Sequence, residues 1–240
     1  MFALFIHMFK QDSWEKIFRE QLIKLRESSP VILINLCLTN PWSADLITSI
    51  RNDFPEAFII MTPNKGRDIG GKMALTDFFI RARLSAEYIV FLHDKQSHHW
   101  FAGESWRQKL FEIIEPGKIE AILEEYLNDP KAGIIGASDF IKNEFDKRTK
   151  RFKTINNDRI QELISIYNLK ISDHRFVAGT MFWVRSSILE RFFSMYSALS
   201  CREKLEEGNF TDQYEGTYTH SWERIFCFLA NDQGYTIKGI

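Results

Sequence analysis

Residues 31–61 read VILINLCLTNPWSADLITSIRNDFPEAFIIM, and an apolar run lies at each end of this stretch. The runs at 31–37 and 57–61 are continuous rather than alternating, which is typical of strands buried on both faces of a parallel sheet. Between them Pro41 interrupts the chain, and Ser43 is a suitable N-cap for a helix. This stretch therefore predicts a strand–helix–strand unit, which is the repeating element of α/β folds.

The same alternation continues on both sides of this unit. Residues 3–9 form a short apolar run that predicts a strand, and the stretch after Ser13 has apolar residues at helical spacing. Residues 72–84 predict a helix, and residues 87–92 (EYIVFL) predict a fourth strand. Strands that alternate with helices predict an α/β fold with a mostly parallel sheet flanked by helices, and we expect residues 1–240 to form a single domain.

The second half of the chain is less regular. Its predicted helices lie at 103–115, 118–128, 157–168, 186–199 and 220–231, and its predicted strands lie at 132–137, 180–184 and 235–240. Residues 142–153 (KNEFDKRTKRFK) carry six basic and two acidic residues and predict an exposed loop or hairpin. Such a charged stretch is most often a solvated face, and contact with anionic lipid or a lipid diphosphate is the alternative.

Composition argues against several classes of protein. The 240 residues carry a net charge of −1, so no overall positive field attracts nucleic acid, and we expect no nucleic-acid partner. The three cysteines, Cys37, Cys201 and Cys227, form no CxxC pair, which argues against a disulfide framework or a zinc knuckle. The apolar N-terminus is too short for a signal-peptide core, and no run reaches the roughly 18 apolar residues of a membrane span. We therefore expect a cytoplasmic protein and leave open a peripheral contact at the inner face of the membrane.

Three stretches place chemically capable side chains beside the predicted strands, where open parallel sheets bind their ligands. The first is residues 64–71 (NKGRDIGG), whose three glycines permit close backbone approach. The N–H groups of the following helix suit an anion such as phosphate, Lys65 and Arg67 add positive charge, and Asp68 can accept hydrogen bonds from a ribose or a base. The stretch is not a Walker A loop, because GxxxxGK[ST] is absent. The alternative is an ordinary glycine-rich turn with a solvated ion pair.

The second stretch is HDKQSHH (93–99), which follows the strand at 87–92 without a spacer. Asp94 can bind a divalent cation through its oxygens, and Lys95 can instead neutralise a diphosphate directly. His98 and His99 are adjacent, and no fixed cysteine or carboxylate spacing supports a zinc site. A capped surface loop is the alternative.

The third stretch is THSWER (219–224), at the start of the last predicted helix. We expect Glu223 in the first turn of that helix, where the helix dipole favours an ionised carboxylate. Such a carboxylate can serve as a general base if it faces a cleft. The alternative is a structural role, in which Glu223 offsets the dipole or pairs with Arg224.

Residues 176–185 (FVAGTMFWVR) predict a buried strand entered through a glycine turn.

Four segments together resemble the rhamnan synthesis protein F family, which contributes to bacterial rhamnose-containing polysaccharides. They are NKGRDIGG (64–71), FLHDKQSHH (91–99) followed by Trp106-Arg107, VAGTMFWVR (177–185) and THSWERIF (219–226). The segments span nearly the whole chain in the right order, so together they are far more specific than any one of them.

The order of these segments is also similar to that of the large inverting family of GT-A glycosyltransferases, whose fold is a Rossmann-like, mostly parallel sheet flanked by helices. That likeness implies that His93-Asp94-Lys95 occupies the place of an Asp-x-Asp donor loop and that Glu223 occupies the place of the catalytic base. Lys95 stands where a second metal-binding Asp is expected. Mg²⁺ or Mn²⁺ on Asp94 is therefore one expectation, and a fixed ammonium on the leaving diphosphate is the other.

The resemblance implies a glycosyltransferase that moves a sugar from a nucleotide diphosphate, with dTDP-rhamnose as the expected donor, to a glycan or lipid-linked glycan. The residues implied for the donor are Asn64, Lys65, Gly66, Arg67, Asp68, His93, Asp94 and Lys95, and those implied for the acceptor are Gly179, His220 and Trp222. A catalytically inactive glycan-binding or scaffolding module is the alternative, because fold alone does not establish catalysis. A metal-dependent hydrolase built on the histidine stretch is a third interpretation, and it requires further ligands.

Overall fold

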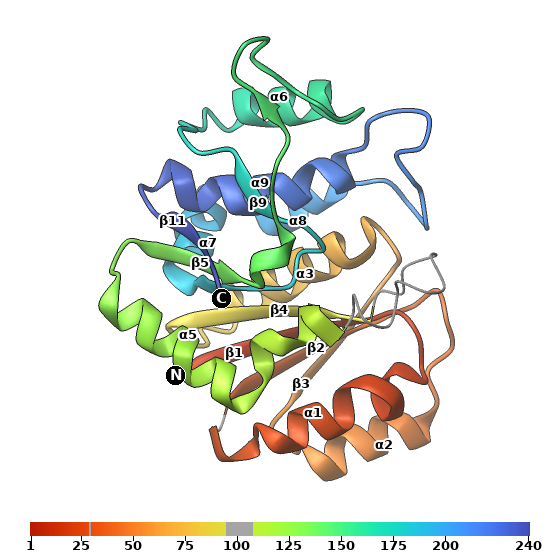
Figure 1. Cartoon of the computed structure of the whole chain (residues 1–240). Coiled ribbons are helices and arrows are strands. Elements are labelled where there is room, and N and C mark those ends of the chain that lie inside the picture. The colour runs from red at the N-terminus through yellow and green to blue at the C-terminus, as the bar shows by residue number, and fades with distance from the viewer. Residues whose placement is uncertain (29, 95–107) are drawn as a thin grey trace.

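The computed structural model describes residues 1–28, 30–94 and 108–240, and a seven-stranded sheet forms its centre (Figure 1). In the order in which they lie side by side, the strands are β11 (Thr236–Gly239), β5 (Ala132–Gly136), β10 (Phe182–Arg185), β4 (Tyr88–His93), β1 (Phe2–Met8), β2 (Val31–Cys37) and β3 (Phe58–Thr62). Strand β10 is antiparallel to both of its neighbours, and the other pairings in this sheet are parallel. The predicted α/β class with a mostly parallel sheet is confirmed.

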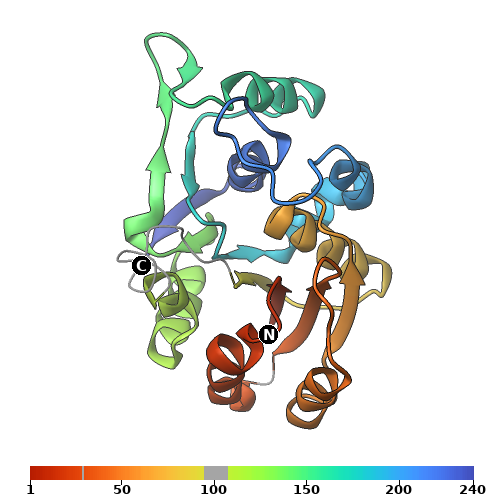
Figure 2. The ribbon, with the colours of Figure 1, turned by 90° about the vertical axis from the view of Figure 1, so that its right-hand side faces the viewer.

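Helices cover both faces of this sheet. The α-helices are α1 (Arg19–Lys24), α2 (Ala44–Asp53), α3 (Arg67–Arg81), α5 (Pro116–Asn128), α6 (Asn157–Ile166), α7 (Ser186–Met195), α8 (Ala198–Glu203) and α9 (Tyr218–Asp232). A π-helical turn at Trp14–Phe18 precedes α1, and short 3₁₀ turns lie at Arg26–Ser28, Glu112–Ile114 and Ser138–Phe140. Helices α1 and α2 lie on one side of the sheet and α3 and α9 on the other (Figures 1 and 2). This double cover explains why β1 and β4 are buried along their whole length and consist of continuous apolar runs.

The direction in which strands are added to the sheet reverses at β1. The chain passes from β1 to β2 and β3 on one side, and β4 then pairs with the other side of β1. The register aligns His7 of β1 with Asn35 of β2 and with His93 of β4, so polar residues of three adjacent strands meet near the carboxyl ends. In open α/β sheets, ligands bind in the crevice beyond such a reversal point.

Helix α3 begins five residues earlier than the sequence predicts. It spans Arg67–Arg81 rather than 72–84, so the loop expected up to residue 71 ends at Gly66. Gly66 is the N-cap and has a φ of +74°, a left-handed conformation that glycine adopts at little cost. The two following glycines therefore lie inside the helix, where their function is packing rather than chain reversal.

The packing function is clearest at Gly71. A Cβ atom at this position would lie 2.1 Å from Nδ1 of His7 and 2.9 Å from Nδ2 of Asn35. Both side chains are buried. The missing side chain thus allows α3 to lie directly on the polar ends of β1 and β2.

Two small sheets lie beyond α9. In one of them β6 (Ile141–Asn143) pairs with β9 (Arg175–Val177), and in the other β7 (Phe145–Asp146) pairs with β8 (Arg151–Phe152). The basic stretch 142–153 therefore contains an exposed hairpin, as predicted, and this hairpin projects beyond α6 in Figures 1 and 2.

Besides α3, two further predicted helices differ from the structure. The helix expected at 186–199 is divided into α7 and α8, because the side chain of Ser197 accepts a hydrogen bond from the N–H of Ser200 and starts a new helix. The helix expected at 103–115 lies partly outside the described residues, and its last part is the 3₁₀ turn at Glu112–Ile114. Within the described ranges, no helix has both the length and the apolar character needed to cross a membrane.

We expect Gly71→Ala to lower the free energy of unfolding by about 1 to 3 kcal/mol, because a methyl group must displace buried side chains of β1 and β2. Urea denaturation measures this change. Gly117→Ala is the matched control, because Gly117 also lies in a helix but has nothing within 4 Å of its added Cβ. That variant should remain within about 0.5 kcal/mol of the parent or be slightly more stable. Equal effects of the two substitutions would contradict the packing function of Gly71.

Candidate functional site

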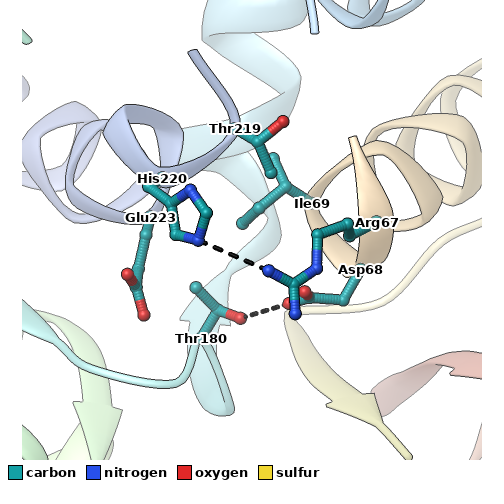
Figure 3. A pocket seen from close by; sticks show the side chains of 7 residues that line it. All are labelled: Arg67, Asp68, Ile69, Thr180, Thr219, His220 and Glu223. Atoms are coloured by element: carbon teal, nitrogen blue, oxygen red, sulfur yellow. Dashed lines mark hydrogen bonds between the residues drawn. The ribbon is translucent and has the colours of Figure 1, made fainter. Parts of the chain in front are cut away.

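A pocket lies where the N-terminal ends of α3 and α9 face the turn before β10 (Figure 3). It is lined by Arg67, Asp68, Ile69, Thr180, Thr219, His220 and Glu223, and it is a shallow pocket that opens to solvent. Thr180 precedes Phe182 of β10, which pairs with Phe91 near the end of β4. The pocket therefore lies at the carboxyl ends of the central strands, where the fold predicts a ligand.

Arg67 supplies positive charge to this pocket. It is the first residue of α3, and its Nη1 lies 3.4 Å from Nε2 of His220, toward which it points in Figure 3. The N-cap residue, Gly66, has no side chain to cap the helix, so the positive end of the helix dipole adds to the charge of the guanidinium. This combination suits an anionic ligand.

Two residues of the pocket have a strained backbone. Arg67 has a φ of +53° and Thr180 a φ of +54°, and the second value is a clear outlier because threonine is β-branched. Conformations of this kind cost on the order of 1 to 3 kcal/mol each and are concentrated at functional sites. Their presence together in the lining of one pocket supports a functional interpretation of that pocket.

A fully buried lysine, Lys72, holds the floor of the site together. Its ammonium lies 3.0 Å from Oδ2 of Asp68 and 3.1 Å from Nδ1 of His93, and it donates to the carbonyl oxygen of Thr180 at 2.8 Å. The hydroxyl of Thr180 also donates to Asp68 at 2.8 Å. These contacts bring Asp68 and His93 into one buried cluster, although His93 does not line the pocket. Lys72 itself was missed, although its spacing of four residues from Asp68 is a recognisable helical ion pair.

Glu223 lines the opposite wall from α9. It lies in the second turn of the helix rather than in the predicted first turn, because α9 begins at Tyr218. Its Oε1 accepts a hydrogen bond from the N–H of Gly179 at 2.7 Å, and its Oε2 lies 2.6 Å from Nη1 of Arg224. The side chain keeps 16% of its surface exposed. Gly179, expected to contact an acceptor, thus holds Glu223 through its backbone.

Arg224 is shared by two carboxylates. While Nη1 contacts Glu223, Nε and Nη2 form a fork on Glu144 with distances between 2.8 and 3.1 Å. The guanidinium is buried and lies 4.4 Å from the centre of the Phe176 ring. Its neighbours Glu223 and Glu144 raise the pKa of Arg224 despite the opposing effect of burial.

The carboxylate that caps the start of α9 is Glu206, which the sequence does not suggest. It accepts hydrogen bonds from the backbone N–H groups of Tyr218 and Thr219 and from the Thr219 hydroxyl. Burial opposes ionisation of Glu206, but these hydrogen bonds outweigh it and lower the pKa of Glu206. The stabilising effect of the helix N-terminus, expected for Glu223, is therefore exerted mainly on Glu206.

Three residues predicted to bind the donor, Asn64, Lys65 and Gly66, do not line the pocket. The segment around Glu206 covers them: its carbonyl accepts from the N–H of Gly66 at 2.7 Å, and the N–H of Gly208 donates to the carbonyl of Asn64 at 2.7 Å. A Cβ on Gly66 would lie 2.2 Å from a methyl carbon of Leu205. This close contact within the chain accounts for the glycine, so the expected phosphate-binding turn is closed by protein.

Asp94 is buried, and its carboxylate accepts hydrogen bonds from the backbone N–H groups of Phe9 and Lys10 at 2.7 to 3.0 Å. These bonds fix the chain after β1 and take up part of the acceptor capacity of both oxygens, and Mg²⁺ or Mn²⁺ on Asp94 stays a prediction. Across the part of the chain that is described, no group of three His, Cys, Asp or Glu side chains could hold a metal ion. Lys95 and the segment after it lie outside the described residues, and the diphosphate contact expected of Lys95 stays a prediction.

Trp222 was wrongly assigned to the acceptor site. The structure places it in the core with no exposed surface, although it directly precedes Glu223. Its ring packs against the rings of Tyr167, Phe192, Phe193 and Phe226. His220, by contrast, does line the pocket, and its Nδ1 lies 2.7 Å from Oγ1 of Thr217, the N-cap residue of α9.

His7 lies behind this site in a chain of buried polar groups. Thr62 donates to Oδ1 of Asn35 at 3.0 Å, which directs the Asn35 amide NH₂ toward Nδ1 of His7 at 2.9 Å. Nδ1 must therefore accept, and the ring must be neutral at that nitrogen. Burial lowers the pKa of His7, and the charges of Asp94 and Asp68 offset part of this effect.

We expect Lys72→Met to lower the free energy of unfolding by about 3 to 5 kcal/mol, because it leaves the carboxylate of Asp68 without its buried cation. Arg81→Met is the matched control, since Arg81 pairs with Asp77 at the same spacing on the same helix but is 70% exposed. The control should cost no more than about 0.5 kcal/mol. If chemical denaturation gave similar decreases in the free energy of unfolding for both variants, the buried contacts of Lys72 would contribute nothing to stability.

Stability should also depend on pH through His7. The unfolded chain binds a proton on this histidine near pH 6.5, whereas the folded chain binds it only at lower pH. The free energy of unfolding should therefore decrease as the pH falls below about 6.5, by up to about 1.4 kcal/mol per pH unit for this group. Urea denaturation at a series of pH values should show a weaker dependence for His7→Gln than for the parent. Parallel curves would contradict the neutral state of folded His7.

Comparison with known proteins identifies a family for this chain. Residues 2–235 match the family model described as rhamnan synthesis protein F. Two curated relatives are each named uncharacterized protein WxcX, and each comes from a different strain of Xanthomonas campestris pv. campestris. They are 27% and 26% identical to this chain over 183 residues. These matches cover 74% of this chain and 24% of each relative, so the chain spans about a quarter of the length of the curated relatives it matches. Since the family model matches nearly the whole chain, the chain belongs to the rhamnan synthesis protein F family.

Proposed function

We propose that this chain is a GT-A-like glycosyltransferase domain that transfers a sugar from a nucleotide diphosphate to a glycan during polysaccharide synthesis. The family's name supports a function in rhamnan synthesis, and the mostly parallel sheet with a pocket beyond its reversal point supports a nucleotide-dependent enzyme. One observation carries the proposal. A cationic helix N-terminus at Arg67 and a carboxylate at Glu223 line the same pocket from two different helices (Figure 3).

A single displacement at the anomeric carbon requires two kinds of assistance. Positive charge must stabilise the departing diphosphate, and we assign this function to Arg67 and the N-terminus of α3, with His220 beside them. A base must accept the proton of the acceptor hydroxyl, and we assign this function to Glu223. Each carboxylate oxygen has more than one acceptor position, so the bonds to Gly179 and Arg224 leave room for a hydroxyl.

Asp68, Lys72 and Thr180 position these groups. Lys72 and the Thr180 hydroxyl both contact Oδ2 of Asp68, so most of the negative charge beside Arg67 is compensated inside the protein. An incoming diphosphate then meets a net positive charge at Arg67 rather than a carboxylate. No step of this mechanism requires a metal ion.

The family's name favours a deoxyhexose donor, and dTDP-rhamnose is our proposal for the donor sugar. The proposed acceptor is a growing glycan or lipid-linked glycan that enters beside Glu223 and His220. A panel of nucleotide sugars tests the donor assignment, and turnover confined to a UDP-hexose would exclude dTDP-rhamnose.

Glu223→Gln should slow sugar transfer by about 100-fold or more, because the amide cannot accept the hydroxyl proton. The variant should fold and should keep the rise in melting temperature that the nucleotide diphosphate causes. Glu125→Gln is the control, because Glu125 also forms an ion pair, with Lys238, but on α5, far from the pocket in sequence. If Glu223→Gln keeps nearly the parental rate of sugar transfer but has a lower melting temperature, Glu223 has a structural role and is not the base.

One observation favours a second function, that of a catalytically inactive glycan-binding or scaffolding module. Both oxygens of Glu223 already have partners within the chain, as expected of a structural carboxylate. Thermal denaturation with nucleotide diphosphates separates the two proposals. A ligand that binds only the folded state raises the melting temperature, so the enzyme should respond to the nucleotide and the glycan-binding module only to a glycan.

A further inference from the structure

The basic hairpin, residues 141–153, carries six basic and two acidic side chains and projects from the body of the described structure (Figures 1 and 2). Its turn, residues 147–150, connects β7 to β8 and lies beyond the layer formed by α6 and α9 (Figures 1 and 2). The proposed reaction uses no side chain at its tip. The hairpin therefore requires a separate explanation.

Most of its cations are available to a partner. Four basic side chains of the hairpin are exposed and form no ion pair with any described residue, namely Lys142, Lys147, Arg148 and Lys150. The two acidic side chains of the hairpin are partly buried and engaged elsewhere: Glu144 contacts Arg224, and Asp146 accepts from the backbone N–H groups of its own turn. Since the whole chain has a net charge of −1, this positive charge is a local property of the hairpin.

The hairpin is fixed in place at its base. The ring of Phe145 stacks on His174 with centroids 3.7 Å apart and an interplanar angle of 3°, and the buried ring of Phe152 stacks on Phe228 of α9. The N–H of Lys153 donates to the carbonyl of Glu144 at 2.7 Å. These contacts hold the charged turn at a defined distance from the body of the protein.

Exposed apolar side chains lie in the segment that follows the hairpin and in the loop before α9. Ile155 follows it directly and is 49% exposed, while Phe210 and Tyr214 are 43% and 87% exposed in the loop before α9. The two segments are joined, because Asn156 donates to Asp212 at 2.7 Å and accepts from the N–H of Thr217 at 2.8 Å. Apolar and cationic side chains therefore come from adjacent segments.

We propose that the basic hairpin, together with Ile155, Phe210 and Tyr214, docks this chain on the surface of an anionic lipid bilayer. Lysine and arginine side chains are attracted to anionic headgroups, and apolar side chains gain by entering the boundary between headgroups and acyl chains. The apolar residues favour a bilayer over a water-soluble polyanion, which offers no apolar phase. The inference does not require the chain to be an enzyme.

Cosedimentation with vesicles tests this surface. The parent chain should bind vesicles of phosphatidylcholine and phosphatidylglycerol, bind pure phosphatidylcholine vesicles far less, and lose affinity as salt is added. Each cation near an anionic surface strengthens binding by roughly fivefold, so Lys147→Gln, Arg148→Gln and Lys150→Gln combined should weaken it on the order of 100-fold. Binding that persists at high salt should come from the apolar side chains. This residual affinity for vesicles should decrease in a second variant that combines Phe210→Ser with Tyr214→Ser.

The matched control removes three exposed cations outside the hairpin, with Arg83→Gln, Lys131→Gln and Arg191→Gln combined. It changes the net charge equally, and Arg83 shares the positive φ of Lys150. This control should bind anionic vesicles within about threefold of the parent, since its cations lie away from the surface. Equal losses in the control and the hairpin variant, or no binding of the parent to anionic vesicles, would overturn the proposal. Binding of the parent to a polyuronate or polynucleotide but not to vesicles would replace the bilayer with an acidic polymer.

Discussion

The ammonium of Lys72 is the interaction on which the geometry of the site depends. An ammonium buried away from water requires acceptors on every side, and Lys72 finds them on α3, at the end of β4 and in the turn before β10. These elements come from distant parts of the chain, and the same contacts hold Thr180 in its strained conformation. The positions of the pocket walls therefore follow from the need to satisfy one charge.

Local patterns predicted the strands well and the start of α3 poorly, for one physical reason. Strands β1, β2 and β4 are continuous apolar runs, and burial on both faces produces that pattern directly. The same expectation was wrong for β3, which lies at the edge of the sheet and is half-buried or exposed along its length. The glycines of α3 favour a turn when their neighbours in sequence are considered alone. Their real constraint at Gly71 is contact with His7 and Asn35, which lie more than 30 residues away in the chain.

The sequence predicts the site residues that follow strands or lie near helix starts. It does not predict the contacts that a loop from a distant part of the chain makes with those residues. Arg67, Asp68, His220 and Glu223 meet in one pocket because parallel strands and their helices bring their ends together. The loop that contains Glu206 covers Gly66 and caps α9, and no pattern around Glu206 indicates either contact. Trp222 resembles a pocket residue in sequence, yet its aromatic neighbours on α7 and near α6 draw it into the core.

The sharing of Arg224 between Glu144 and Glu223 has a thermodynamic consequence. Glu144 stands at the root of the hairpin and Glu223 in the pocket, and one guanidinium contacts both. A partner that breaks the ion pair between Glu144 and Arg224 leaves Arg224 paired with Glu223 alone. A ligand that breaks the ion pair between Glu223 and Arg224 likewise leaves Arg224 paired with Glu144 alone. Linkage makes such effects equal in both directions: the factor by which hairpin contact changes affinity in the pocket is the factor by which pocket occupancy changes affinity at the hairpin.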